Sequence, residues 1–412
     1  MNEAKRILLL MDAPGAPLYA PRMRYLISNL TKRGWRFTVI SEKMPHTDFH
    51  FADCQHLQFP YYEDKSKLRN RLRWIADKLF NLKEHRFLQF IKKHIEPSEV
   101  DCILCSSFHT FPLPTAARLA KQWNLPLIAD LRDIAEQWGE TPYMQHPICT
   151  PFRSVNKQLT QAYTRQSIRQ RNKALEIASS VITVSPWHQK TLQPVHPSVR
   201  LIYNGYDEYT FIPKNIPSET FHIIYTGKIY DVQLRNPLLL FQALDALREQ
   251  GRLPENLSVD FYCEKGIQDE LSELAKRHCI ADRIHIDNFV SNQQVIPLLH
   301  RSSICLILTN KADHNGPHGI MTTKFFEALG VEKPVLCVPS DEECLADVIQ
   351  QTNAGLAATS VEEIQAFILD KYAEWKKNGF TRQAVLQEEK QRFSRQYQAK
   401  QFEQLFMQTI HG

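Results

Sequence analysis

The chain has 412 residues, of which 43% are apolar and 23% charged, and its formal net charge is +5. This length is too great for a single core and suits two domains of roughly 200 residues each. The apolar run at residues 7–11 is too short for a secretory signal, and no run approaches the roughly 18 apolar residues of a membrane span. We therefore expect a cytoplasmic protein, either soluble or peripheral on the inner face of a membrane.

Short apolar strands alternate with helices in the first half of the chain. Residues 5–11 predict a strand that ends in a loop, and a helix is expected over residues 21–33. Further strands are expected at residues 35–40, 100–105, 125–129 and 181–184, with another helix at 114–123. This alternation predicts a parallel, doubly wound sheet.

The same pattern restarts after Asn204-Gly205. Strands are expected at residues 221–225, 257–262, 284–286, 303–308 and 334–338, a helix at 237–250, and an amphipathic segment at 383–410. The predicted fold is α/β, with two Rossmann-like doubly wound domains facing an interdomain cleft. We expect the domains to span residues 1–205 and 206–385, with a C-terminal helix at 386–412 packing back on the first domain.

Charge and cysteine usage fit this division. Residues 1–205 carry 29 Lys and Arg against 17 Asp and Glu, whereas residues 206–412 carry 21 against 28. Such opposite balances indicate domains with different partners.

The nine cysteines are scattered, which is typical of reduced thiols in a cytosol. Cys102 and Cys105 form a CxxC pattern inside an apolar strand, where residues three apart face opposite sides, so we expect no metal or redox site there.

The most informative stretch covers residues 316–330, a glycine-containing loop that leads into a helix. Free N–H groups at a helix N-terminus bind phosphate, and Lys324 adds a positive charge in the first turn. Glu327 lies three residues further on, on the same helix face, and its carboxylate can accept hydrogen bonds from sugar hydroxyls. Taken alone, this stretch predicts a phosphate-binding α/β turn.

Several short motifs, taken in order, make the chain resemble the GT-B glycosyltransferases, and it is most similar to family 4 and to bacterial surface-polysaccharide enzymes. The similarity spans most of the chain. The landmarks are Pro14-Gly15 with Arg22, Ser106-Ser107 with His109, and residues 129–133, 184–185, 204–207, 225–228 and 323–327. The resemblance implies transfer of a sugar from a nucleotide-diphosphate sugar to an acceptor hydroxyl. It also implies retention of configuration, no metal and no cofactor.

On the donor side, the resemblance assigns Lys228 and Arg235 to the diphosphate. A departing nucleoside diphosphate gains negative charge in the transition state, and fixed cations stabilise that charge. The alternative is two solvated surface cations. Glu327 matches a glutamate that binds the ribose, with Lys324 one turn earlier.

The resemblance also expects a glutamate at position 319, where this chain has Gly319. That glutamate contacts the donor sugar in the family. We expect the N–H groups of Gly319 and Ile320 to hold phosphate instead. The sugar contact must then come from a nearby polar residue, for which the candidates are Asp313, His314, Asn315 and His318.

In the first domain, the resemblance places His109 at the donor sugar or reacting centre as a hydrogen-bond donor, the alternative being a residue at a helix N-terminus without a ligand. Asp133 lies in a charged turn after an apolar strand and is the candidate acceptor-side ligand or base. Gly15 would let the backbone approach the donor closely. Arg22, Asp130 and Arg132 are expected on the acceptor side. The alternatives are a structural ion-pair turn at residues 130–133 and a capping or surface role for Arg22.

The expected partners are a nucleotide-sugar donor and a glycan or lipid-linked acceptor, such as a growing lipopolysaccharide. Residues 65–93 resemble a basic amphipathic helix that could rest on an anionic membrane surface, the alternative being an ordinary helix with a solvated basic face. No motif supports nucleic-acid binding. The remaining alternatives are a catalytically degenerate GT-B-like partner subunit and another nucleotide-sugar enzyme such as an epimerase.

Overall fold

The computed structural model describes residues 4–12, 21–43, 49–61, 69, 72–73, 76–77, 80–108, 110–139, 152–232, 234–312 and 316–411. The chain forms two compact units, each with its own parallel sheet. Unit 1 comprises residues 1–203 together with 395–412, and unit 2 comprises residues 204–394.

Unit 1 is built on a seven-stranded parallel sheet with the order β3-β2-β1-β4-β5-β6-β7. Its strands are β1 (Arg6–Met11), β2 (Arg36–Glu42), β3 (Gln55–Phe59), β4 (Cys102–Ser107), β5 (Leu127–Leu131), β6 (Ser180–Thr183) and β7 (Val199–Leu201). Its helices are α2 (Pro21–Thr31), α4 (Leu82–His94), α5 (Leu113–Trp123), α6 (Arg153–Leu175), α7 (Pro186–Leu192) and α15 (Arg395–His411), with short 3-10 turns η1 (Pro97–Glu99) and η2 (Ala135–Trp138).

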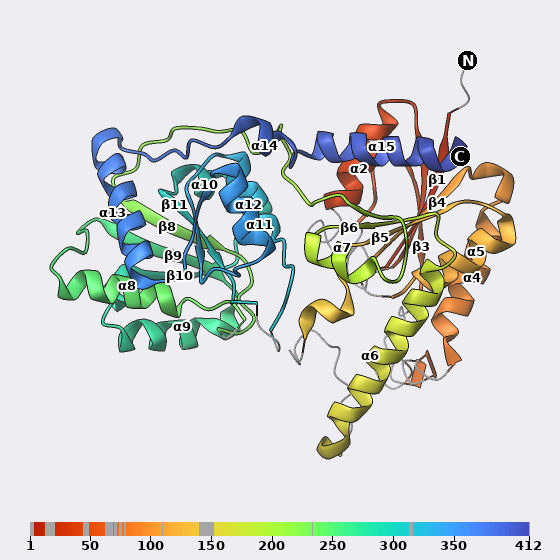
Figure 1. Ribbon diagram of the computed structural model, residues 1–412, viewed down its shortest axis with the longest axis horizontal. Coiled ribbons are helices and arrows are strands. Elements are labelled where there is room, and N and C mark those ends of the chain that lie inside the picture. Colours follow the sequence, from red (N-terminus) through yellow and green to blue (C-terminus); the bar gives the residue numbers. More distant parts are fainter. Residues whose placement is uncertain are drawn as a thin grey trace. The chain divides into compact units, whose positions relative to one another are not determined.

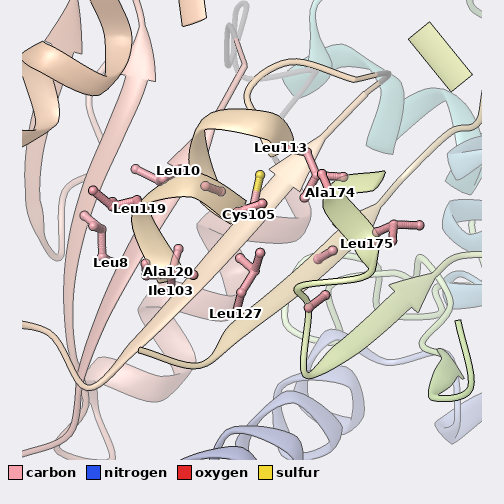
Figure 2. Packing of buried hydrophobic residues seen from close by; sticks show 14 of the residues in the cluster. Leu8, Leu10, Ile103, Cys105, Leu113, Leu119, Ala120, Leu127, Ala174 and Leu175 are labelled. Carbon is pink, nitrogen blue, oxygen red and sulfur yellow. The ribbon is translucent and has the colours of Figure 1, made fainter. Parts of the chain in front are cut away.

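Both faces of this sheet are buried, because successive side chains of a strand point to opposite faces. Leu8 and Leu10 of β1 pack beneath α4 and α5, together with Ala174 and Leu175 from the end of α6 (Figure 2). The alternate residues of β1 pack on the other face, against α2 and α15. Figure 1 shows α15, in blue, lying beside α2, in red, so the two ends of unit 1 pack together.

The two cysteines of the CxxC pattern lie on opposite faces of β4, as expected for residues three apart in a strand. Cys102 lies in the core on the α2 side of β4, and Cys105 lies in the core on the α5 side. Both thiols are buried, and burial raises the pKa of each. Two thiols on opposite faces of one strand cannot share a ligand.

Unit 2 contains a six-stranded parallel sheet with the order β10-β9-β8-β11-β12-β13. Its strands are β8 (Phe221–Thr226), β9 (Leu257–Cys263), β10 (Ile284–Asn288), β11 (Ile304–Leu308), β12 (Val335–Val338) and β13 (Gly355–Ala357). Its helices are α8 (Leu238–Glu249), α9 (Lys265–Arg277), α10 (Asn292–Arg301), α11 (Thr323–Gly330), α12 (Cys344–Thr352), α13 (Val361–Asn378) and α14 (Gln387–Gln391), with the 3-10 turn η4 (Ala281–Arg283).

The predicted α/β class and both parallel sheets are confirmed, with differences at the C-terminal end. The single amphipathic segment expected at residues 383–410 is two helices, α14 and α15. Residues 386–394 belong to unit 2, so the C-terminal part that rejoins unit 1 begins at Arg395 and not at residue 386. The apolar periodicity of α15 comes from its buried residues, which include Phe402 and Phe406 in the core of unit 1.

Candidate functional site

The strand order of each sheet reverses at one point, and this places a candidate site in each unit. In unit 1 the reversal lies between β1 and β4, and in unit 2 it lies between β8 and β11. Ligands of open parallel sheets bind beyond the carboxyl ends of the strands at such a point. The residues that follow these four strands are therefore the candidates for the site.

In unit 2, the residue that follows β8 is Gly227, and its backbone has a φ of +133°. A Cβ atom at this position would lie 2.6 Å from Nζ of Lys324, so that a side chain here would require the flexible lysine to move. The φ of Gly227 and this close approach both favour glycine, and the approach shows that the Lys324 side chain extends from the first turn of α11 to the end of β8. The two short motifs 226–228 and 323–327, almost 100 residues apart in sequence, form one site.

The charge of Lys324 is held in a partly desolvated place. Its Nζ atom lies 5.5 Å from the ring centroid of Tyr225, and the residue is half-buried. Burial and, to a smaller extent, the positive charge of Arg235 lower the pKa of Lys324 to about 8, against opposing contributions from Glu327 and Glu264. A cation destabilised in this way gains from a bound anion.

Arg235 contributes a second cation at the neighbouring strand. Its Nη1 atom donates a hydrogen bond of 2.8 Å to the carbonyl oxygen of Leu308, the last residue of β11. Lys228 is exposed, and its Nζ atom lies 5.6 Å from the ring centroid of Tyr230. The structure thus brings Arg235 close to Lys324, whereas the sequence paired it with Lys228.

Two acidic residues accompany these cations. Glu327 is half-buried on α11, one turn after Lys324. Glu264, directly after β9, was not predicted. Its carboxylate accepts hydrogen bonds from the backbone N–H groups of Ile229 (3.1 Å) and Tyr230 (2.6 Å), which fixes the loop that follows Gly227. The sequence feature that could have indicated Glu264 is its position as an acidic residue immediately after an apolar strand.

The loop before α11 differs from the prediction at Gly319. This residue has a φ of +63°, and its N–H donates a hydrogen bond of 3.2 Å to Oε2 of Glu343. Nδ1 of His318 lies 2.8 Å from Oε1 of the same carboxylate. The Gly319 N–H, predicted to hold phosphate, thus bonds a carboxylate in this structure, and its phosphate-binding role stays a prediction.

A carboxylate therefore lies beside position 319 although the residue there is glycine. It comes from Glu343, the residue that precedes α12, which the sequence analysis did not single out. His318 was one of the residues expected to compensate, and it is the one that contacts Glu343. Ile320 is half-buried. The other compensating candidates, residues 313–315, lie outside the described residues.

In unit 1, Asp12 connects the three strands at the reversal point. It follows β1, and its Oδ2 atom accepts a hydrogen bond of 2.7 Å from the N–H of Phe108, just after β4. Its Oδ1 atom accepts one of 2.6 Å from Nη2 of Arg132, just after β5. Burial raises the pKa of Asp12, and Arg132 partly offsets this. Arg132 therefore lies at the strand ends, bonded to an acidic residue that the sequence analysis did not select.

Asp133 lies next to this cluster. Its Oδ1 atom accepts a hydrogen bond of 2.5 Å from Nε2 of Gln137 in η2. Burial raises the pKa of Asp133 to about 6, against opposing contributions from Gln137 and Arg132. A carboxyl group with a pKa near neutrality can exchange a proton at the pH of a cell. His109 and Gly15, also predicted for this region, lie outside the described residues.

Arg22 and Asp130 form a buried ion pair, with Nη2 and Oδ1 separated by 3.0 Å and side-chain exposures of 4% and 0%. Arg22 also donates to the carbonyl of Tyr203, and its guanidinium lies 5.0 Å from the ring centroid of Phe402. Asp130 accepts a further hydrogen bond from the hydroxyl of Ser106. The acceptor-side role predicted for Arg22 and Asp130 is corrected to a structural one, because neither side chain reaches the surface and their polar atoms are used internally.

The described residues offer neither a metal site nor a membrane-spanning helix. No group of three His, Cys, Asp or Glu side chains in the described ranges is placed to hold a metal ion. Among the helices of these ranges, none combines the length and apolar character needed to cross a membrane.

Comparison with known proteins finds similarity to solved structures alone. No family model matches the chain, and no curated protein matches it. Solved structures do. Sucrose-phosphate synthase from Thermosynechococcus elongatus is similar with a TM-score of 0.63 at 15% identity, over 98% of each chain. Anabaena HepE in complex with UDP-glucose gives the same TM-score and identity, over 98% of this chain and 99% of that one.

The lipopolysaccharide outer core galactosyltransferase WaaB is similar with a TM-score of 0.59 at 11% identity, over 97% of this chain and 98% of that one. Each of these likenesses extends over both units and both sheets. The chain has the GT-B fold. At such identities the likeness is one of fold, and the chemistry of a GT-B chain has to be argued from its own residues.

Proposed function

We propose that the protein is a glycosyltransferase that moves a sugar from a nucleotide-diphosphate sugar to a hydroxyl of a glycan acceptor. The acceptor would be lipid-linked or part of a lipopolysaccharide, and the reaction would proceed with retention of configuration and without a metal ion, as in family 4. The GT-B fold supports this proposal, as does the similarity to HepE bound to UDP-glucose and to a lipopolysaccharide galactosyltransferase.

The observation that carries the proposal is the placement of Lys324 against Gly227, with Arg235 nearby, at the strand reversal of unit 2. Burial and the nearby arginine raise the free energy of the charged lysine when no anion is bound. A diphosphate carries the charge that would offset this cost. Glu327, one turn after Lys324, is the proposed acceptor for the ribose hydroxyls.

These residues would act mainly on the leaving group. The bond between the anomeric carbon and the diphosphate oxygen breaks, a bond to the acceptor oxygen forms, and the hydroxyl proton is released. Lys324 and Arg235 would stabilise the negative charge that accumulates on the diphosphate. On unit 1, Asp133 would bind the acceptor or take its proton, with a pKa suited to that task.

A thermal-shift experiment with UDP, GDP, ADP and dTDP tests the donor site. A ligand that binds only the folded protein at about 100 times its Kd stabilises it by about 2.7 kcal/mol. We expect one diphosphate to raise the Tm, and Glu327→Ala to weaken this response at least about tenfold in Kd, as expected for loss of a hydrogen bond to a charged group.

The matched control is Glu270→Ala, which removes an exposed carboxylate on α9 of the same unit and should leave the response unchanged. The absence of stabilisation by any diphosphate would count against the proposal. Stabilisation without transfer from the matching nucleotide sugar would indicate the degenerate partner subunit.

We further propose that Glu343, held by His318 and the Gly319 N–H, supplies the carboxylate for the donor sugar that position 319 lacks. Glu343→Gln preserves the shape but removes the charge. We expect diphosphate binding within about twofold of the wild type and a kcat for transfer lowered by at least about tenfold, since the loss falls on the reacting sugar and not on the nucleotide.

Glu342→Gln is the control for this variant, because Glu342 is the exposed neighbour that pairs with Lys311. It should leave both quantities unchanged. Equal losses of diphosphate binding and of kcat in Glu343→Gln would show instead that this carboxylate only supports the loop.

A further inference from the structure

Helix α6 of unit 1 is the longest helix of the described residues, and it is strongly basic. Its 23 residues include six Lys or Arg and no Asp or Glu. Figure 1 shows its C-terminal part beside α5, with the N-terminal part extending beyond the other helices of unit 1. A positive surface of this kind attracts a negatively charged partner.

The C-terminal part fixes which face of α6 points inward. Ala174 and Leu175 belong to the core, and Arg171 is 2% exposed, with two 2.7 Å hydrogen bonds to the carboxylate of Glu136. Thr160 is also buried. At about 100° of rotation per residue, these four positions fall on one side of the helix.

The opposite side of α6 carries apolar and basic side chains together. Val155 and Leu159 are 39% and 42% exposed, and they lie four residues apart. Arg165 and Arg169 are exposed and, by the same helical rotation, share this outward side. The surface extends about 21 Å along the helix, at 1.5 Å per residue. We call it the α6 face, defined by Val155, Leu159, Ala162, Arg165, Gln166 and Arg169.

We propose that the α6 face rests on an anionic lipid surface. Aliphatic side chains beside arginines suit the boundary between headgroups and acyl chains, where the aliphatic groups enter the apolar layer and the guanidinium groups meet lipid phosphates. An acidic protein would satisfy the charges but would leave Val155 and Leu159 without a comparable environment. This inference does not depend on sugar transfer, although it would hold unit 1 next to a lipid-linked acceptor.

The α6 face differs from the surface predicted at residues 65–93. Within the described part of that segment, α4 places Phe87 and Ile91 in the core of unit 1, whereas Arg86 and Lys93 are exposed. The exposed basic residues of α4 therefore provide an internal comparison for those of α6.

Co-sedimentation of the full chain with vesicles tests the proposal. We expect binding to vesicles of 30% phosphatidylglycerol in phosphatidylcholine and none to phosphatidylcholine alone. Arg165→Glu with Arg169→Glu should weaken binding at least about tenfold, since each basic residue near such a surface contributes on the order of fivefold. Val155→Ser with Leu159→Ser, which keeps the charge, should also weaken it several-fold. All four side chains are exposed, so the fold should be retained, and unchanged circular dichroism would verify this.

Two charge-matched controls complete the experiment. Arg86→Glu with Lys93→Glu on α4, and Arg277→Glu with Lys377→Glu on unit 2, should each stay within about twofold of the wild type, because neither pair belongs to the α6 face. The proposal would be overturned by wild-type protein that ignores phosphatidylglycerol, by an equal loss in either control, or by full binding of the serine variant. The diphosphate thermal shift reports on unit 2 separately, so failure of one proposal is distinguishable from failure of the other.

Discussion

At the scale of single residues, the two units hold titratable groups with opposite shifts. Burial lowers the pKa of Lys324 to about 8 and raises that of Asp133 to about 6. In both cases the charged form is disfavoured, since desolvation penalises charge of either sign. These shifts make ligand binding and stability depend on pH near neutrality.

Lys324 should make diphosphate binding depend on pH. A bound diphosphate favours the ammonium form, so binding takes up a proton when the pH exceeds about 8. We expect the affinity for the stabilising diphosphate to fall several-fold between pH 7 and pH 9.5, as measured by isothermal titration calorimetry. Lys324→Arg should reduce this pH dependence, because arginine stays charged throughout that range. An identical slope in both proteins would contradict the placement of Lys324 at the phosphate.

Asp133 should destabilise the folded protein at neutral pH. Its pKa is higher in the folded state than the usual 3.8, so its contribution is fully favourable below pH 3.8 and is lost as the pH rises through about 6. Asp133→Asn should therefore stabilise unit 1 by about 1–2 kcal/mol at pH 7.5, a figure reduced for partial solvent exposure. The gain should shrink toward pH 4 in denaturant titrations. A gain that is constant with pH would indicate a cause other than ionisation.

At the scale of elements, a buried charge network joins the turn after α11 to the segment around α14. Glu332 is 4% exposed, and its carboxylate contacts Lys390 at 2.8 Å, Arg382 at 2.6 Å and Gln387 at 3.0 Å. Nζ of Lys390 also donates to the carbonyl of Gly330, the last residue of α11. This network holds the C-terminal end of the site helix in unit 2.

Removing Glu332 should leave Lys390 as an uncompensated buried charge. We expect Glu332→Ala to cost about 3–5 kcal/mol at pH 7 in urea unfolding of the protein. Burial opposes ionisation of this carboxyl, but hydrogen bonds from Lys390, Arg382 and Gln387 hold its pKa below the usual 4.5. Its contribution is therefore present above pH 4.5 and is lost as the pH falls below it.

The cost of Glu332→Ala should accordingly shrink at pH 3.5. Glu362→Ala is the control, because Glu362 is an exposed acidic residue in the first turn of α13. This variant should lower the free energy of unfolding by less than about 1 kcal/mol. A deficit of equal size at both pH values would mean that packing, and not charge, explains the loss.

At the scale of the whole molecule, the chain leaves unit 1 after Tyr203 and returns to it at Arg395. The returning helix completes the core of unit 1. Phe402 and Phe406 are buried, Phe406 lies 5.5 Å from the ring of Trp35, and Glu403 pairs with Arg33 at 2.6 Å. Unit 1 is therefore not contiguous in sequence, and its stability depends on the last 18 residues.

Phe402→Ala should destabilise unit 1 by about 3–5 kcal/mol, because it leaves a cavity and removes the ring that lies against Arg22. The response of unit 2 to its diphosphate should persist, which differential scanning calorimetry with and without the ligand would test. Met407→Ala, on the same helix but 42% exposed, should have little effect. Loss of the diphosphate response in Phe402→Ala would mean that the units do not unfold separately.

Local pattern predicted most of the strands and the helices α2, α5, α8 and α11, but not α6 or α13, the two longest helices of the described residues. It missed β3, β7 and β13, which are short and mostly half-exposed and so lack a continuous apolar run. The same limit to neighbouring residues explains which site residues could be selected from the sequence. Lys324 and Glu327 could be selected because they share one short helix with a glycine loop before it. Glu264 and Glu343 could not, because their hydrogen-bond partners lie 24 to 35 residues away in sequence.

The sequence by itself determined the α/β class, the doubling of the parallel sheet and the candidate phosphate helix, because these depend on periodicity and on neighbouring residues. Only the tertiary structure decided that Lys324 lies against Gly227, that Glu343 stands beside Gly319, and that Arg22 and Asp130 are buried together. It also decided that residues 386–394 belong to unit 2, so that the part that rejoins unit 1 begins at Arg395. Such contacts join residues tens to hundreds of positions apart, and they are set by the order of strands in a sheet and by close packing, which no local pattern encodes.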